Sequence, residues 1–90
     1  MELYYTMNRI YGSDESGNIL AEITFPSLDS HTVNISHTFV DSSLKGQGMG
    51  VRLVKAAADS FRRSGLKAVV TCDYAKHWFE KHPEYSDVLR

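Results

Sequence analysis

Three glycines at alternate positions, Gly46, Gly48 and Gly50, separate a segment with the periodicity of a strand from a segment with the periodicity of a helix. A loop of this kind leaves several backbone N–H groups without partners at a helix N-terminus, where the helix macrodipole adds partial positive charge. Glycine lets an anion approach the backbone closely and accepts positive φ angles. Lys45, just before the first glycine, can add a charge that reaches a phosphate oxygen. The pattern predicts a phosphate-binding loop, and an ordinary flexible loop is the alternative.

Three strands are expected before the loop. Residues 3–11 are rich in aromatic and β-favouring side chains, residues 12–18 (GSDESGN) are turn formers, and residues 19–25 alternate between apolar and polar positions, which predicts a hairpin. Residues 32–40 alternate again and lead into the glycine loop. This third strand is predicted to carry four side chains on one face: Val33, Ile35, His37 and Phe39.

After the loop the apolar period becomes that of a helix, which predicts a helix over residues 49–63. Gly65 follows it, where a left-handed residue commonly ends a helix. Residues 67–72 (KAVVTC) are a short β-branched run typical of a buried parallel strand. Because a strand, helix, strand unit crosses over with a right-handed geometry, this fourth strand should lie parallel to the third. The apolar stripe of the helix comprises Leu53, Val54, Ala57, Ala58 and Phe61.

A last helix is expected over residues 73–80, with Asp73 as its cap and with Ala75, Trp78 and Phe79 on one face. Pro83 prevents its continuation. The predicted fold is an α/β domain, a single domain over residues 1–90, in which a mostly antiparallel sheet of four strands packs against two helices and the last strand pair is parallel.

The charge balance argues against a protein that holds nucleic acid by general phosphate attraction, because ten Lys and Arg against eleven Asp and Glu give a formal net charge of −1. The basic residues crowd residues 45–67, which a solvated helix face explains more simply than a steering patch for an anion. A single cysteine, Cys72, excludes an internal disulfide and fits a reducing compartment. No apolar run suits a secretory signal or a membrane span, so a soluble, cytoplasmic protein is expected. The oligomeric state stays open, with a monomer as the expectation.

Two common nucleotide-binding motifs do not fit the glycine loop. A P-loop ends in Gly-Lys-Ser or Gly-Lys-Thr, whereas Gly50 precedes Val51 and Arg52. The dinucleotide fingerprint is G-x-G-x-x-G with an acid closing the second strand, whereas the spacing here is G-x-G-x-G and the strand ends at Thr71 and Cys72. The sequence therefore excludes these two classes of nucleotide site.

The segments LKGQGMGVRLV (residues 44–54) and TCDYAKHWFEKHPEY (residues 71–85) together resemble the GNAT superfamily of acetyl-CoA-dependent N-acetyltransferases. The signature of that superfamily is Arg or Gln, two residues, Gly, one residue, and Gly or Ala. Lys45, Gly48 and Gly50 fill it here, with lysine as a conservative departure. The length and the closing His82-Pro83-Glu84-Tyr85 resemble the minimal, single-domain GNAT-like subfamily.

The resemblance implies a mode of binding coenzyme A. In that family the third and fourth strands splay apart, and the pantetheine arm lies between them and pairs with strand backbone, here near Phe39 and Val40. Two amides in the arm suit an unpaired strand edge. The pyrophosphate would lie on the backbone N–H groups of the loop and first helical turn: Gly46, Gln47, Gly48, Met49, Gly50 and Val51.

The resemblance leaves the catalytic groups open. Many relatives place a carboxylate base on the strand before the loop, but residues 32–40 contain no Asp or Glu, and His37 is the available titratable side chain. A lone histidine on an apolar face is also a common core residue. Relatives carry a proton-donating Tyr at the position that matches Phe79, which cannot donate. Tyr74 is the nearest substitute by sequence, and it is also expected to line the cofactor site or to pack.

Cys72 would stand at the mouth of the splayed strands, near the thioester sulfur and close to a helix start that favours a thiolate. The minimal subfamily also has a cysteine at this position. Three interpretations remain: a nucleophile that forms an acetyl-cysteine, a wall of the coenzyme A pocket, or a buried small apolar residue.

A metal site is rejected, because five residues along a helix turn His77 and His82 apart and Pro83 breaks the helix. The predicted function is binding of acetyl-CoA and transfer of its acetyl group to an amine in an open site, with a protein lysine, an N-terminus or a polyamine as acceptor. The alternative is a non-catalytic module that binds coenzyme A.

Overall fold

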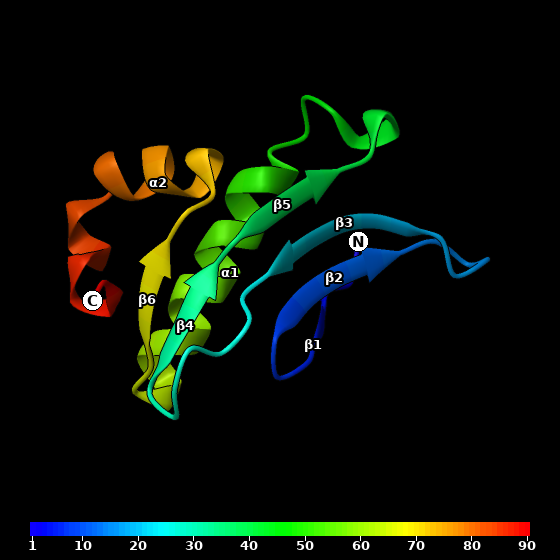
Figure 1. Cartoon of the computed structure of the whole chain (residues 1–90). Coiled ribbons are helices and arrows are strands. Elements are labelled where there is room, and N and C mark those ends of the chain that lie inside the picture. Colours follow the sequence, from blue (N-terminus) through cyan, green and yellow to red (C-terminus); the bar gives the residue numbers. More distant parts are fainter.

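Six strands, two α-helices and two short 3-10 helices form the chain in the computed structural model, which describes residues 1–90 (Figure 1). In chain order they are β1 (Tyr4–Tyr5), β2 (Arg9–Ser13), β3 (Ile19–Thr24), β4 (Thr32–Ile35), β5 (His37–Val40), η1 (Ser42–Leu44), α1 (Met49–Ser64), β6 (Lys67–Val70), α2 (Asp73–Glu80) and η2 (Pro83–Val88).

The strands form a four-stranded antiparallel sheet in the order β1-β2-β3-β5, and β4 pairs in parallel with β6. This confirms the predicted fold class of a mostly antiparallel sheet with a parallel strand pair. The strand count differs from the prediction, because residues 3–11 contribute β1 and the start of β2, and residues 32–40 contribute both β4 and β5.

The expected third strand is broken at Ser36, so the prediction of one shared face for its side chains is wrong. The Ser36 N–H donates to Thr24 O at 3.1 Å, which turns the chain from β6 toward β3. The alternation shifts by one residue at this break, because side chains have a period of two only along an uninterrupted strand. Ile35 is buried, as is Val33, whereas His37 and Phe39 are exposed.

The helix α1 has the predicted start and stop, and it extends one residue beyond the predicted end. Gly65 has φ 72° and donates its N–H to Phe61 O, as expected of a left-handed residue that closes a helix. The buried face of α1 packs against the sheet and comprises Met49, Leu53, Val54, Ala57, Ala58 and Phe61.

The helix α2 has the predicted bounds, but Asp73 is not its cap. Cys72 occupies the cap position with extended backbone, and its side chain makes no capping hydrogen bond to the helix, while Asp73 lies in the first turn. A carboxylate in the first turn still interacts favourably with the helix dipole, so the acid has a role one position later than expected.

The element η2 fastens the end of the chain to α1. The Tyr85 hydroxyl donates to Asp59 Oδ1 at 2.6 Å, and the Arg62 guanidinium donates to both carboxylate oxygens of Asp87 at 2.9 and 2.6 Å. The hydrogen bond from Tyr85, followed by the hydrogen bond and charge of Lys55, lowers the pKa of Asp59. These contacts hold α2 indirectly, because α2 leads straight into η2.

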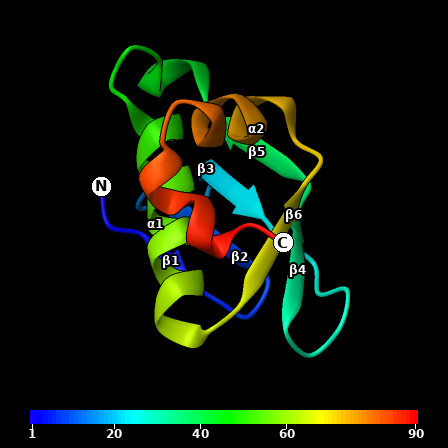
Figure 2. The same cartoon turned by 90° about the vertical axis from the view of Figure 1, so that its left-hand side faces the viewer.

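Both α-helices lie on one side of the strands. Figure 2 shows α1 on one side of the molecule and the β4 and β6 pair on the other, with α2 across the end. No helix is long and apolar enough to cross a membrane.

Candidate functional site

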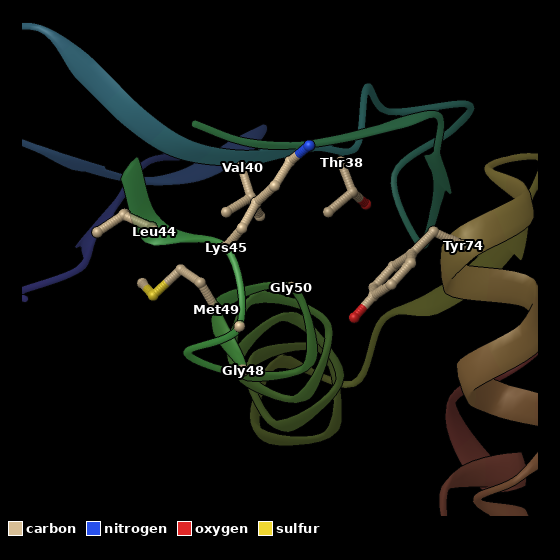
Figure 3. Close-up of a pocket in the computed structure, with 9 residues that line it drawn as sticks. Thr38, Val40, Leu44, Lys45, Gly48, Met49, Gly50 and Tyr74 are labelled. Atoms are coloured by element: carbon tan, nitrogen blue, oxygen red, sulfur yellow. The ribbon is translucent and has the colours of Figure 1, made fainter. Parts of the chain in front are cut away.

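A pocket of about 350 Å³ lies at the N-terminus of α1, between β5 and the start of α2 (Figure 3). Its lining residues are Thr38, Val40, Leu44, Lys45, Gly46, Gly48, Met49, Gly50 and Tyr74. Lys45 is the one charged side chain among them, so the pocket carries a positive charge and no negative one.

The glycines have the conformations that the loop requires. Gly46 has φ 81° and Gly48 has φ 71°, a region that other residues rarely adopt, and a Cβ at either position would meet no atom within 4 Å. At Gly50 a Cβ would lie 2.6 Å from the Tyr74 hydroxyl. Gly50 therefore gives the Tyr74 ring room to reach across from α2 to the first turn of α1, as Figure 3 shows.

Five backbone amides between residues 46 and 51 make no hydrogen bond within the protein. They belong to Gly46, Gly48, Met49, Gly50 and Val51, and the first amide of the helical turn with a partner is that of Arg52, which donates to Gly48 O at 3.0 Å. Unpartnered N–H groups at a helix N-terminus carry partial positive charge and favour an anion. The pocket thus has the donor set of a phosphate site.

The loop is anchored where it leaves β5. Asp41 caps η1 by accepting the Ser43 N–H at 3.0 Å and the Ser43 hydroxyl at 2.6 Å, and these hydrogen bonds lower the pKa of Asp41. The Asp41 N–H in turn donates to Leu20 O of β3 at 2.7 Å. The glycine loop therefore starts from a point fixed to the sheet.

The strands β5 and β6 separate just beyond Ile35, whose carbonyl accepts the N–H groups of both Thr71 (3.0 Å) and Cys72 (3.1 Å). β5 pairs only with β3 and presents a free edge toward the gap. Since the Asp41 amide points to β3, the alternation of an antiparallel ladder directs the backbone groups of Thr38 and Val40 to the free edge. Sequence analysis expected Phe39 and Val40 in this role.

Cys72 lies at the start of this gap. Its Sγ is 3.4 Å from the Thr38 hydroxyl, and the residue is half-buried and forms no disulfide. Cys72 does not itself line the pocket, but Thr38 does, so the thiol is one residue removed from the cavity wall. Phe79, at the position of the proton-donating tyrosine in relatives, is buried in the core.

Seven of the residues expected to bind cofactor line the pocket: Val40, Lys45, Gly46, Gly48, Met49, Gly50 and Tyr74. Five expected site residues do not: His37, Phe39, Gln47, Val51 and Cys72. Two lining residues were missed, Thr38 and Leu44. Thr38 faces the pocket because of the break at Ser36, which no local pattern signals. Leu44 is the last apolar residue before the glycines and could have been included. No group of three or more His, Cys, Asp or Glu side chains is placed to hold a metal ion.

Comparisons with known structures find the same fold. A GCN5-like protein from Staphylococcus aureus, solved by NMR, aligns with 41% identity and a TM-score of 0.78 over 99% of this chain and 87% of that chain. YhbS from Escherichia coli, a GNAT family N-acetyltransferase crystallised with CoA, aligns with 24% identity and a TM-score of 0.62 over 77% of this chain and 42% of that chain. The second likeness concerns the fold alone.

Among curated proteins, Protein NATD1 from Xenopus tropicalis is 32% identical over 63 residues, which cover 70% of this chain. The matched segment spans 58% of the length of that relative. The family model described as GCN5-related N-acetyl-transferase matches residues 9–88, nearly the whole of the sequence. The chain therefore belongs to the GCN5-related N-acetyltransferase family, as the resemblance of its glycine loop and last helix indicated.

Proposed function

We propose that the pocket at the start of α1 binds acetyl-CoA and that the chain transfers the acetyl group to an amine. The observation that carries this proposal is the set of five unpartnered amides from Gly46 to Val51, beside a lysine and without an acid in the lining. Family membership and the CoA complex of YhbS support the same ligand.

The chain's groups suit the parts of that ligand. The five amides and Lys45 would hold the pyrophosphate, because backbone donors at a helix N-terminus and a flexible ammonium both favour phosphate oxygens. The free edge of β5 at Thr38 and Val40 would pair with the amides of the pantetheine arm, as an added strand does. Both glycines with positive φ leave open space where a side chain would obstruct the ligand.

Bound acetyl-CoA supplies a thioester whose carbonyl carbon accepts a nucleophile. The chain's task is then to orient the amine, to take its proton and to return a proton to the departing thiolate. We assign His37 as the candidate base, because it is exposed on β5 beside the strand gap and can meet an acceptor there. Tyr74 is the candidate proton donor, since its hydroxyl reaches the pocket from α2.

Cys72 offers a second route. Its thiolate would attack the acetyl carbon, release the CoA thiolate and leave an acetyl-cysteine, from which the amine would take the acetyl group and restore the thiol. As a pocket neighbour, Cys72 would instead position Thr38 through the 3.4 Å contact between their side chains. Intact mass separates the two roles, because only the covalent route adds one acetyl group that Cys72→Ser abolishes.

The experiment that tests the function is an amide NMR titration with acetyl-CoA, followed by a thiol-release assay with and without a primary amine. We expect shifts at residues 46–51 and along β5, and faster release of CoA when the amine is present. A His37→Gln variant should then flatten the pH dependence of the rate; an unchanged profile with an intact fold would remove His37 as the base.

A non-catalytic CoA-binding module is the second candidate, favoured by Phe79, a buried phenylalanine at the position where relatives carry a proton-donating tyrosine. Shifts upon titration without any amine-dependent release of CoA would support the module and contradict the transferase. No shifts at millimolar ligand would contradict both.

A further inference from the structure

The four-stranded sheet has one face packed on α1 and one face that residues 1–90 leave uncovered. Ile10, Ala21 and Ile23 are completely buried on the packed face. Their neighbours in sequence point the other way, because side chains alternate along a strand. In Figure 1 α1 lies behind β4 and β5, and no helix lies in front of β2, β3 or β5.

The strand register brings three aromatic side chains and a carboxylate into one line on the uncovered face. Tyr4 pairs with Tyr11, Tyr11 with Glu22, and Glu22 with Phe39. These four residues are called the aromatic row below. Tyr4 is 44% exposed and Phe39 is 38% exposed, and the two tyrosine rings lie with their centroids 5.5 Å apart. Large exposed aromatic side chains gathered on one face indicate a contact surface.

The aromatic row already holds a cation of its own chain. The Arg9 guanidinium lies 4.1 Å from the centroid of the Tyr11 ring and 2.8 Å from Glu22 Oε2. At the end of the row, Tyr4 donates to Glu2 Oε2 at 3.0 Å. Aromatic faces beside carboxylates attract ammonium and guanidinium groups, so the chemistry of the row suits a cationic partner.

The formal charge of the chain is divided unequally between the two halves of the sequence. Residues 1–44, which form the whole four-stranded sheet, contain six Asp and Glu against one Lys or Arg, a formal charge of −5; residues 45–90 contain five against nine, a formal charge of +4. Such a division steers cations to the half that holds the four-stranded sheet and anions to the half that holds both α-helices. An amine acceptor and a polyphosphate ligand would thus approach opposite sides of β5.

The strand β5 joins the aromatic row to the pocket. Phe39 and His37 point to the uncovered face, whereas Thr38 and Val40 line the pocket on the other side. An acceptor that lies along the aromatic row therefore ends at β5, the edge strand of the sheet. The proposed thioester site lies on the other side of β5, beside the gap between β5 and β6.

We propose that the uncovered sheet face is the docking surface of the acceptor, and that the acceptor is an extended, lysine-rich polypeptide segment. The proposal rests on the acetyltransferase function proposed above and names its substrate class. Three strand spacings make the row about 14 Å long, which an extended chain of about four residues spans. A small amine contacts only the β5 end and gains nothing from Tyr4 and Tyr11.

The experiment measures the affinity of a fluorescently labelled lysine-rich peptide by anisotropy, without turnover. The test variant is Tyr4→Ser combined with Tyr11→Ser, and Tyr4→Ser alone is the milder second variant. Tyr5→Ser is the matched control, because Tyr5 is also exposed but pairs with Ile10 and so points to the opposite face of the same short strand. The control peptide keeps one lysine and replaces the others by glutamine.

Loss of two cation–π contacts at exposed sites should lower the affinity for the lysine-rich peptide roughly fivefold to twenty-fivefold in the double variant. Loss of one such contact in Tyr4→Ser should lower it roughly twofold to fivefold. Tyr5→Ser should bind as the wild type does, and the control peptide should bind weakly to all proteins. Added salt should lower the affinity for the lysine-rich peptide more than the affinity for the control peptide, because salt screens exposed charges.

Equal affinity of the wild type and the double variant, or an equal loss in Tyr5→Ser, would overturn the docking surface. So would self-association through the same residues, seen as concentration-dependent amide shifts of the row without peptide. A failure of the proposed transferase function is a separate result, because it would be seen as no amine-dependent release of CoA with a small amine. The peptide affinities test only the docking surface.

Discussion

Gly48 and Gly65 flank α1 with almost the same backbone conformation, and this makes them a matched pair for testing the glycine loop. Gly48 has φ 71° and ψ 21°, and Gly65 has φ 72° and ψ 21°. A Cβ at either position would meet nothing within 4 Å. Alanine at each position therefore introduces backbone strain of equal size and no steric clash.

The strain of a non-glycine residue in the left-handed region is about 1–2 kcal/mol. The lower entropy of the unfolded chain with alanine offsets about 0.4–1 kcal/mol of this. We expect each variant to lose about 1 kcal/mol of unfolding free energy, which lowers Tm by about 4–8 °C for a chain of this size. The two variants should be equally destabilised.

The two variants should differ in ligand binding. Gly48 lines the pocket and contributes one of the unpartnered amides, whereas Gly65 lies at the far end of the 16-residue helix, about 24 Å away. A misplaced loop in Gly48→Ala loses at least one hydrogen bond to a charged phosphate, about 1.5–3 kcal/mol. Affinity for acetyl-CoA should therefore fall about tenfold to a hundredfold in Gly48→Ala and stay at the wild-type value in Gly65→Ala.

Thermal unfolding followed by circular dichroism gives the stabilities, and isothermal titration calorimetry gives the affinities. Equal affinity of both variants for acetyl-CoA would refute the assignment of the loop as the phosphate site. An equal loss of affinity in both would show that general destabilisation, and not the loop, controls binding.

Three further predictions concern the contact of η2 with α1, the wall of the pocket and the core. Tyr85→Phe removes the hydrogen bond to Asp59 and should lower the free energy of unfolding by about 1–2 kcal/mol near neutral pH. Because the hydrogen bond lowers the pKa of the Asp59 carboxyl in the folded protein, this stabilisation is present above the unfolded-state pKa and is lost as the pH falls through the folded-state pKa. The urea midpoints of the variant and the wild type should therefore converge in acid. Gly50→Ala should push the Tyr74 ring aside, since a Cβ would lie 2.6 Å from its hydroxyl, and calorimetry should record weaker acetyl-CoA binding with little change in Tm. Phe61→Ala, in the completely buried core, should cost about 3–5 kcal/mol and lower Tm steeply; a small change in the melting curve would contradict its burial.

The sequence was sufficient to predict the elements whose signals are local. The start and stop of α1 depend on glycines beside an apolar period of 3.6, and the positive φ of Gly46 and Gly48 follows from the same loop. The unpartnered amides of the loop were predictable for the same reason, because the first N–H groups of a helix lack intrahelical partners whatever the rest of the fold does.

The break at Ser36 was not predictable from local pattern, and neither were its consequences. Residues 32–40 alternate without interruption, but the chain changes partner strands between Ile35 and His37. Which carbonyl accepts the Ser36 amide depends on where β3 and β6 lie, and this is tertiary information. Sequence analysis therefore placed His37 on a buried face and overlooked Thr38.

The same break makes the candidate site possible. A continuous strand over residues 32–40 would pair along its length with β6 and close the gap, and its free edge would disappear. Because the strand changes partner at Ser36, β5 is held by β3 and β6 is held by β4, so each side of the gap is supported without the other. The contacts of η2 with α1 add support for α2, whose first turn carries Tyr74 to the pocket wall opposite β5. An unpaired strand edge in so short a chain exposes backbone groups that favour pairing, and in this family member the partner we propose is the amide-bearing arm of the cofactor.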